Sequence, residues 1–463
     1  IIFLILLYFI LIFSYNYFFY LKNITYTIHY IIFLGVPFLF IISSFFFLFT
    51  KKNIKINFLI SLTTVLFVMY GFNLYFTFKL DLRTKEKEKL AKIIGIDYDT
   101  RTKIQIINSY KKNKKVLFPA VYSNINYSNN FFINEKKIHT LGGISNVETI
   151  LCNESGKWEI YKSDRYGFNN FDENYDKKNI KIGIVGDSFL QGHCVSRDQT
   201  IGSLLDKNFG KTLTIATAGS GTLTYLAFMS EYLQQYKPKF VLWFFYSNDL
   251  SEQHSERKQF KILNNYLYKK NFNQNLKLYQ NEIDKQLIEV VNNENPDKFK
   301  SKIKKYINFF SFQKIFGELT SMIYQIQKNY SVNENIILNT LDKETEYQFL
   351  IDVLLKAKEI TSEWNGTLIA VYIPTQAELL EKEMENPLLI TNSIFNNLMK
   401  MNNISNIDIM KDLKKEQNIE SLYALDLPYS KLGITNHFDE DGYKKISDII
   451  IKELRENYKE REN

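Results

Sequence analysis

The sequence has few of the residues that build metal sites and disulfide scaffolds. It contains two cysteines, Cys152 and Cys194, and five histidines among 463 residues. The cysteines form no CxxC pair and the histidines do not cluster, which argues against a structural zinc site and a disulfide-rich scaffold. In an oxidising compartment, one disulfide between the two cysteines remains an alternative. We therefore expect no metal and no other cofactor.

Arginine-rich stripes and nucleic-acid motifs are also lacking. The chain has 58 Lys and Arg against 50 Asp and Glu, a net charge of +8, but its basic residues are dispersed among acidic ones. A nucleic-acid-binding domain gathers basic residues on one face or along one helix, so we expect no nucleic-acid partner. With 45% hydrophobic residues, the chain is expected to fold, and its length leaves room for two or three domains.

Charge is almost absent from the first 78 residues. Only four charged side chains occur there: Lys22, Lys51, Lys52 and Lys55. Residues 1–20, 30–50 and 56–78 carry none, and each run reaches the ~20 residues that cross a hydrocarbon core of about 30 Å. Because such runs have no polar face for solvent, we predict three transmembrane helices within residues 1–79, a lipid-bilayer partner and a multi-pass membrane protein.

The loops around these runs give conflicting signals on orientation. Lysines in the loop 51–55 favour the cytoplasm, which places the following domain outside, whereas the basic residues between Lys79 and Lys92 favour the opposite. We expect the outside orientation because the chemistry inferred below suits it. The chain begins with Ile rather than Met, so three is a minimum number of spans.

The remaining sequence changes character near residue 180. Residues 80–180 are predicted to form a charged connector and an irregular N-terminal extension. From 181 to 460, short apolar runs alternate with helical stretches, which predicts an α/β domain with a parallel sheet flanked by helices. The expected strands are 181–185, 212–217, 239–246, 367–372 and 404–410. Residues 251–345 are too long for an ordinary loop and are predicted to form a helical insertion.

A candidate nucleophile follows the first of these strands. The strand ends in Gly186-Asp187-Ser188 and leads into a helix. A serine at the carboxyl end of a parallel strand stands where such sheets bind ligands, with backbone N–H groups of the next turn facing it. This placement suits a nucleophile, and it suits a helix-capping serine equally well.

Two further turns follow the next two strands. After 212–217, the turn with Gly221 lets a backbone N–H approach a developing oxyanion without a side chain in the way. After 239–246 comes Asn248, whose amide can complete an oxyanion hole, where one donor contributes about 2.7–4 kcal/mol. Each feature alone is common in ordinary turns.

A histidine lies before the last expected helix, which runs from Asp441 to about Tyr458. Serine needs a base within hydrogen-bond reach, and His437 can supply it. A lone histidine is more often structural, but four such features at one edge of one sheet favour a single site. Asp439 lies on the helix side of His437 and is expected to be a helix N-cap.

Together these segments resemble a known family. Gly186–Phe189 (GDSF), the Gly221 turn, the Asn248-Asp249 pair and the His437 turn resemble blocks I, II, III and V of the SGNH/GDSL hydrolase superfamily. The resemblance spans about residues 180–460 and implies a flavodoxin-like SGNH fold.

The resemblance also implies roles for individual residues. Ser188 would be the nucleophile and His437 the base. The oxyanion donors would be the Ser188 N–H, Gly221 and Asn248. The segment 141–170 further resembles bacterial membrane-anchored SGNH proteins, which implies the bacterial inner membrane with the hydrolase domain extracytoplasmic.

One position departs from the family pattern. The superfamily places an Asp two or three residues before the histidine, where this sequence has Thr435 and Ile434. Thr435 offers only a neutral hydroxyl, which can orient His437 without stabilising its charge. We therefore expect a Ser188–His437 dyad, slower than a full triad, with Thr435 as the orienting group.

Three functions follow as hypotheses. The first is a membrane-anchored serine esterase that hydrolyses an acyl ester, with esters on carbohydrates among its substrates, through an acyl-enzyme on Ser188. The second is an O-acyltransferase of a cell-surface polysaccharide, in which a sugar hydroxyl replaces water. The missing Asp keeps a third hypothesis open, a catalytically silent SGNH-fold protein for polysaccharide assembly or binding.

Overall fold

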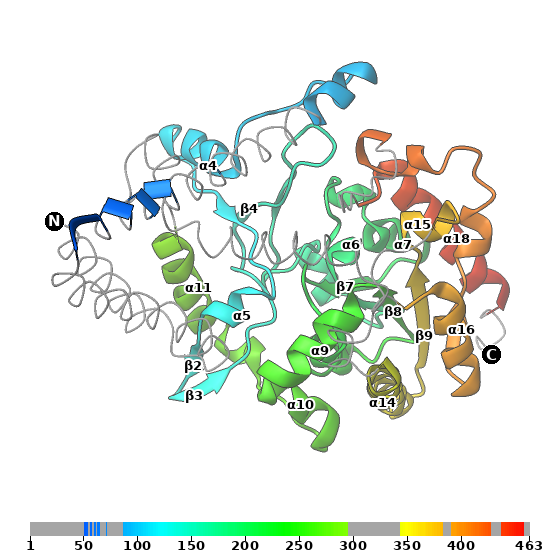
Figure 1. The fold of residues 1–463 in the computed structure, drawn as a ribbon. Coiled ribbons are helices and arrows are strands. Elements are labelled where there is room, and N and C mark those ends of the chain that lie inside the picture. The colour runs from blue at the N-terminus through cyan, green and yellow to red at the C-terminus, as the bar shows by residue number, and fades with distance from the viewer. Residues whose placement is uncertain are drawn as a thin grey trace. The chain divides into compact units, whose positions relative to one another are not determined.

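The computed structural model describes residues 87–294, 343–382, 390–426 and 437–457, with scattered positions between 51 and 71. The chain divides into two units, and only scattered positions of the unit formed by 1–82 and 300–329 are described. All elements discussed below belong to the other unit, residues 83–299 and 330–463 (Figure 1).

A five-stranded parallel sheet forms the centre of this unit. Its strands are β6 (Ile182–Gly186), β7 (Thr212–Ala216), β8 (Phe240–Tyr246), β9 (Thr367–Ile373) and β10 (Ser405–Ile407). They lie in the order β10-β9-β8-β6-β7, and every neighbouring pair is parallel. Each strand overlaps one of the five expected from the sequence. The prediction of an α/β fold with a parallel sheet is therefore confirmed.

Both faces of the sheet are buried, because its strands are apolar at successive positions. In β8, Val241, Trp243 and Phe245 belong to one buried cluster. Leu242 and Phe244, which alternate with them, belong to a second cluster on the opposite face. Unbroken apolar runs of this kind are typical of parallel strands covered by helices on both sides.

Helices supply much of the rest of each cluster, and the residues before β6 add further side chains to the Trp243 cluster, among them Phe131 and Phe168. The Trp243 cluster takes side chains from α8 (Thr222–Phe228), α9 (Asp249–Gln259), α10 (Lys261–Tyr268), α11 (Gln280–Glu294), α14 (Lys343–Ser362) and α16 (Asn392–Met401). The second cluster takes them from α6 (Ser188–Gln191), α7 (Ile201–Phe209), α15 (Gln376–Leu379), α17 (Met410–Leu413) and α18 (Glu440–Asn457). The described part of the predicted insertion 251–345 is mostly helical, and the predicted domain boundaries stay predictions.

The residues before β6 form a smaller layer, here called the extension (residues 87–181). One small sheet has β1 (Phe118–Pro119), β4 (Glu148–Ile150) and β5 (Ile160–Lys162), and the other has β2 (Phe131–Ile133) and β3 (Lys136–Ile138). The extension also contains the α-helices α4 (Lys103–Lys112) and α5 (Ile125–Ser128). Strands of two or three residues are too short to show an alternating pattern, so the sequence predicted only turns here.

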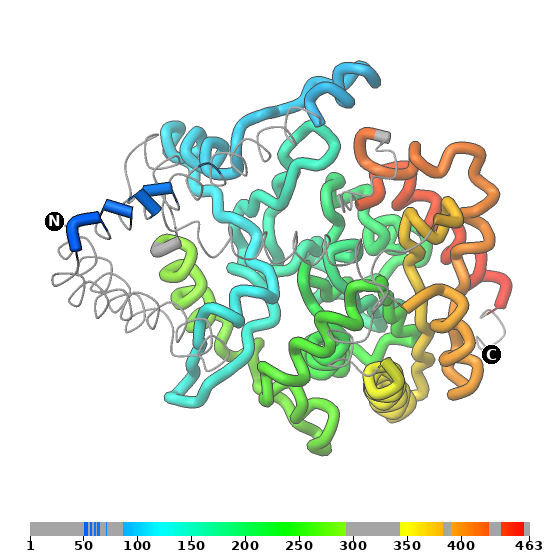
Figure 2. Tube along the Cα trace, in the orientation of Figure 1, coloured from blue at the N-terminus to red at the C-terminus, as the bar shows by residue number. Residues whose placement is uncertain are grey.

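Backbone and side-chain bonds join the extension to the central sheet region. The Ser123 N–H donates to the Ala218 carbonyl at 3.1 Å, and the Thr217 hydroxyl donates to the Leu141 carbonyl at 3.1 Å. Figure 2 shows the extension, largely in cyan, beside the green segments that contain the residues after β7. The extension therefore reaches the carboxyl end of β7.

The prediction of three transmembrane helices is contradicted. Within the described part of the chain, no helix is both long enough and apolar enough to cross a bilayer. The two described helices of 18 residues or more, α14 and α18, carry charged side chains that solvate one face. The same finding contradicts the prediction of a multi-pass membrane protein and gives no support to the predicted bilayer partner. Residues 1–20, 30–50 and most of 56–78 lie outside the described residues.

Candidate active site

Ser188 stands at the carboxyl end of β6, as predicted. Gly186 ends the strand, and Asp187 caps the short helix α6 by accepting the Phe189 N–H at 3.0 Å. A Cβ added at Gly186 would come within 2.8 Å of Leu190, so glycine allows the helix to start this close to the strand. Ser188 is the first residue of α6, and it is half-buried.

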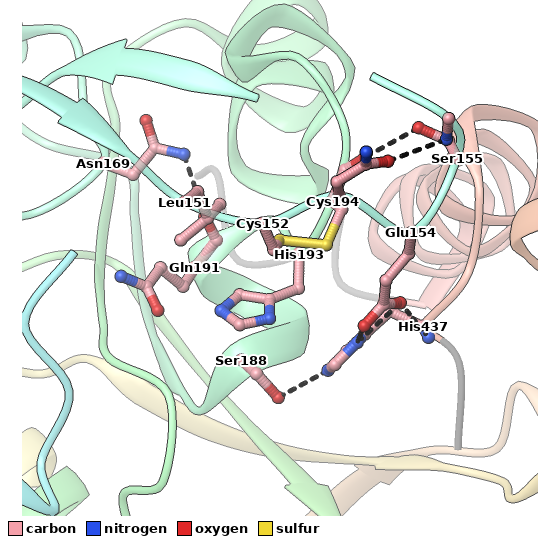
Figure 3. The surroundings of a disulfide bond; sticks show 12 residues. Leu151, Cys152, Glu154, Ser155, Asn169, Ser188, Gln191, His193, Cys194 and His437 are labelled. Atoms are coloured by element: carbon pink, nitrogen blue, oxygen red, sulfur yellow. Dashed lines mark hydrogen bonds and ion pairs between the residues drawn. A yellow bond between two sulfur atoms is a disulfide. The ribbon is translucent and has the colours of Figure 1, made fainter. Parts of the chain in front are cut away.

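His437 lies directly beside Ser188. Its Nε2 is 2.8 Å from the Ser188 Oγ (Figure 3). The same Oγ lies 3.2 Å from an oxygen of Asp187. A serine hydroxyl has one proton to donate, and the shorter contact favours donation to His437. Phe189 and His193 pack against the imidazole, with ring centroids 4.7 and 4.8 Å from its own.

A carboxylate from the extension holds the other side of this imidazole. Both carboxylate oxygens of Glu154 lie 3.1 Å from His437 Nδ1, and one of them accepts the His437 backbone N–H at 2.9 Å. The two residues are 283 positions apart in the sequence. When Nδ1–H donates to the carboxylate, Nε2 is free to accept the Ser188 proton. Ser188, His437 and Glu154 therefore form one hydrogen-bonded series.

The pKa values of Glu154 and His437 shift in opposite directions. Burial acts to raise the pKa of Glu154, but the charge and hydrogen bonds of His437 outweigh it and lower that pKa to about 2. Burial acts to lower the pKa of His437, but the charge and hydrogen bond of Glu154, with the charge of Asp187, raise it above its ordinary value. Each partner stabilises the charged form of the other.

Sequence reasoning missed Glu154 because the family pattern directs attention to the residues just before the histidine. Thr435, the expected orienting group, lies outside the described residues, as does Ile434. The contact at His437 Nδ1 comes from Glu154. Asp439 accepts the Gly442 N–H at 2.9 Å, so the expected N-cap of the last helix is confirmed.

The two cysteines were the sequence feature that could have indicated Glu154. They form a disulfide, with Cα atoms 5.6 Å apart. Cys152 lies two residues before Glu154, and Cys194 lies six residues after Ser188. A bridge between them therefore brings the carboxylate to the segment that carries the serine.

Two of the three predicted oxyanion donors, Gly221 and Asn248, already have partners. The Gly221 N–H donates to the Glu256 carboxylate at 2.7 Å. The Asn248 side-chain amide donates to Glu252 at 3.2 Å. Because an amide NH₂ group carries two hydrogens, Asn248 keeps a second donor, whereas the single N–H of Gly221 is engaged.

Gly219 has the open backbone geometry that was expected of Gly221. Its φ is +72°, a region that favours glycine, and an added Cβ would meet no atom within 4 Å. Among the residues that the structure describes, its N–H has no acceptor. Gly219 follows β7, and the end of β7 pairs with the end of β6 through Ala216 and Gly186. It therefore lies at the same edge of the sheet as Ser188.

Glu256 fixes the turn that contains these glycines. Its carboxylate accepts the N–H groups of Gly221 at 2.7 Å, Leu223 at 3.1 Å and Thr224 at 3.3 Å. These groups start helix α8 and have no partner within the helix. Burial raises the pKa of Glu256 to about 7, although its hydrogen bonds oppose the shift. Glu256 thus has a structural role at the start of α8.

Two groups of side chains have the spacing of metal ligands. Glu154, His193 and His437 bring one ligand atom each within 4.8 Å, and so do Cys152, His193 and Cys194. Glu154 is hydrogen-bonded to His437, and the two sulfur atoms are bonded to each other. Most of these ligand atoms are therefore already engaged in other bonds.

Comparison with known proteins gives only distant matches. No protein-family model matches the sequence, and no curated protein is similar to it in sequence. Among solved structures, TesA is similar with 10% identity and a TM-score of 0.31, over 59% of this chain and 98% of TesA. A lipase/acylhydrolase from Enterococcus faecalis is similar with 11% identity and a TM-score of 0.31, over 59% of this chain and 95% of the other.

A third similar structure is a family 3 carbohydrate esterase from Clostridium thermocellum, with 14% identity and a TM-score of 0.29 over 60% of this chain and 96% of the esterase. Likenesses this distant assign no residue of this chain, whose site is defined by its own contacts.

Proposed function

We propose that this protein is a serine esterase of the SGNH/GDSL type that hydrolyses an acyl ester through an acyl-enzyme on Ser188. The observation that carries the proposal is the series of contacts from Ser188 Oγ to His437 Nε2 at 2.8 Å, and from His437 Nδ1 to Glu154 at 3.1 Å. Nucleophilic catalysis by serine needs a base in reach of the hydroxyl and a third group that orients the base. These residues supply all three groups.

The reaction follows from this arrangement. Ser188 Oγ attacks the ester carbonyl while His437 Nε2 takes its proton, and Glu154 stabilises the imidazolium that results. His437 then gives the proton to the departing alcohol, which leaves the acyl group on Ser188. Water attacks the acyl-enzyme with His437 as base, the acid departs, and Ser188 regains its proton.

The developing oxyanion requires N–H donors beside Ser188. The proposed donors are the Ser188 N–H, the Gly219 N–H and the second amide hydrogen of Asn248. Gly219 takes the place predicted for Gly221, because the Gly221 N–H donates to Glu256.

Glu154 also weighs against the catalytically silent alternative. That hypothesis depended on the missing Asp before His437, which left the base without a carboxylate. Glu154 contacts the nitrogen that such an Asp would contact, so it supplies the carboxylate whose absence that hypothesis assumed. Acyl esters are the proposed substrate class, and acetylated oligosaccharides are the natural test of a carbohydrate substrate.

A fluorophosphonate probe on the purified full-length chain tests the proposal. The probe reacts with activated serines, so mass spectrometry should find the adduct on Ser188, and Ser188→Ala should remove it. Ser196→Ala is the matched control, because Ser196 lies on the same segment and its hydroxyl bonds to Asp198. A folded protein that neither reacts with the probe nor hydrolyses p-nitrophenyl acetate or acetylated oligosaccharides would overturn the proposal.

A further inference from the structure

The disulfide joins the segment of the acid to the segment of the nucleophile. Glu154 lies in the loop between β4 and β5, here called the acid loop (residues 151–159), and Cys152 is part of that loop. Cys194 lies beyond the end of helix α6, which begins at Ser188. Figure 3 shows the sulfur–sulfur bond beside His193, close to the contacts of Ser188, His437 and Glu154.

The Cys194 end of this bridge is firmly held. The N–H of the preceding His193 donates to the Ser188 carbonyl at 3.1 Å. The His193 carbonyl accepts the hydroxyl of Tyr443, in helix α18, at 2.6 Å. The His193 ring packs on the His437 ring. This half of the bridge is therefore tied to the nucleophile, the base and the last helix at once.

The Cys152 end is held within the extension, where the Asn153 amide donates to the Asp99 carbonyl at 2.9 Å and the Gly156 carbonyl accepts the Asp99 N–H at 2.7 Å. Inside the acid loop, the Gly156 N–H donates to Asn153 at 3.0 Å, and the Glu159 N–H donates to the Cys152 carbonyl at 3.0 Å. These bonds give the loop its shape without tying it to the helix that carries the serine. Cys152 packs against a cluster of only three buried side chains, Ala120, Leu151 and Tyr161.

Two further contacts from the acid loop to the serine's side of the site are weak. Ser155 Oγ lies 3.5 Å from the Cys194 carbonyl, at the limit of a hydrogen bond. Lys157 lies 3.7 Å from Glu440, with more than half of each side chain exposed, and exposed ion pairs contribute little. The covalent bridge is the strongest tie between the acid loop and the segment of Ser188.

Glu154 needs such a tie because its position is opposed by solvation. Burial penalises its carboxylate, and the contacts with His437 offset that penalty only while the loop stays in place. A loop free to move would therefore let the carboxylate return to water. Catalytic groups act well only when held within about 0.5 Å of their working position.

We propose that the Cys152–Cys194 disulfide is the positioning element for Glu154, and that opening it lowers esterase turnover by releasing the acid from His437. The inference rests on the proposed function, since it concerns the same triad. Opening the bridge takes two electrons and two protons. A dithiol such as dithiothreitol supplies them, and it is oxidised to its cyclic disulfide while both cysteines become thiols.

A double-mutant cycle separates this role from a merely structural one. Its four proteins are the native chain, Cys152→Ser/Cys194→Ser, Glu154→Gln, and the triple variant. If the bridge acts through Glu154, removing it should lower kcat/KM for p-nitrophenyl acetate about 10- to 100-fold in the native background. The same removal should change kcat/KM less than about 3-fold in the Glu154→Gln background, because the acid is already absent.

The titration of His437 gives a second readout that does not depend on activity. NMR of the labelled imidazole should show its pKa falling when the bridge is removed from the native chain, and staying unchanged when it is removed from Glu154→Gln. If the double variant does not fold, the native chain and Glu154→Gln are compared before and after dithiothreitol. Reoxidation should then restore both the activity and the titration of the native chain.

The outcomes are distinct. Equal losses in both backgrounds, or no loss in the native one, would overturn the inference and leave the esterase proposal intact. Absence of esterase activity in all four proteins would overturn the proposed function. In that case a His437 pKa unchanged by opening the bridge would overturn the positioning role as well.

Discussion

The central sheet and the extension meet at the site, and they are built differently. The sheet buries both faces in two large clusters and presents Ser188 from the end of β6. The extension has strands of only two or three residues, and it presents Glu154 from a loop beside a cluster of three buried side chains. A well-packed scaffold thus holds the candidate nucleophile, while a crosslinked loop holds the candidate acid. Substitutions on each side can therefore measure how far each region contributes to one reaction.

The largest effect is expected from the sheet side. Ser188→Ala should lower ester hydrolysis by about 10⁴- to 10⁶-fold while leaving the fold intact, because removal of the nucleophile leaves only binding and oxyanion stabilisation. The measurement is kcat/KM on p-nitrophenyl acetate, with circular dichroism to check folding. Ser196→Ala should behave like the native chain. Residual activity above about one per cent would show that another group is the nucleophile.

The next effect is expected from the extension. Glu154→Gln keeps the shape of the side chain but removes its charge, so kcat should fall by about 10³- to 10⁴-fold through loss of the imidazolium's partner. The matched control is Glu148→Gln, since Glu148 lies on the neighbouring strand β4 with its side chain exposed. A loss below 10-fold would mean that the sheet side works as a Ser188–His437 dyad without the extension.

The same contrast explains what the sequence could and could not predict. The five strands of the sheet were predictable because long apolar runs, such as 240–246, mark parallel strands buried on both faces. The position of Ser188 was predictable because it closely follows such a strand, and that of His437 because it comes just before the last helix. Glu154 was not, because it lies in a short loop 283 residues from its partner, and no local periodicity marks a contact of that range. The cysteine spacing was the one covalent clue to it.

The turns that carry the proposed oxyanion donors show a second limit of prediction from sequence. The sequence pointed to the turn after β7, but it could not tell which glycine N–H of that turn already has an acceptor. That depends on Glu256, a residue of α9 that accepts the Gly221 N–H. Glu256, on a separate helix, is therefore the reason why Gly219 rather than Gly221 is the proposed donor.

Asn248 tests the oxyanion hole of the sheet side. Asn248→Ala should lower kcat by about 10²-fold with little change in KM, because its amide would donate only in the transition state. Glu252→Gln is the control, since it keeps Asn248 but changes the partner of its amide. A change confined to KM would assign Asn248 to ground-state binding of the substrate.

The pH dependence of activity reports on the contact between the two regions, because Glu154 of the extension affects the protonation of His437. His437 acts as a base only when neutral, so kcat/KM should fall as pH drops through its pKa in the free enzyme. Glu154 raises that pKa, which places this acid limb above the value of about 6.5 of an ordinary histidine. In Glu154→Gln burial still acts to lower the pKa, so the limb should move to lower pH. An unchanged limb would contradict the proposed contact between the two residues.

The smallest effect is expected at Thr435, which the family pattern singled out. If Glu154 supplies the charge at His437 Nδ1, a hydroxyl at position 435 has no acid function left to fill, and Thr435→Ala should change kcat/KM by less than about 3-fold. Thr435→Asp should not raise the activity of the native chain, because the nitrogen already has a carboxylate. In the Glu154→Gln background, however, Thr435→Asp could restore activity only if position 435 faces the imidazole. Such a rescue, together with a large loss of activity in Thr435→Ala alone, would show that position 435 rather than Glu154 orients His437.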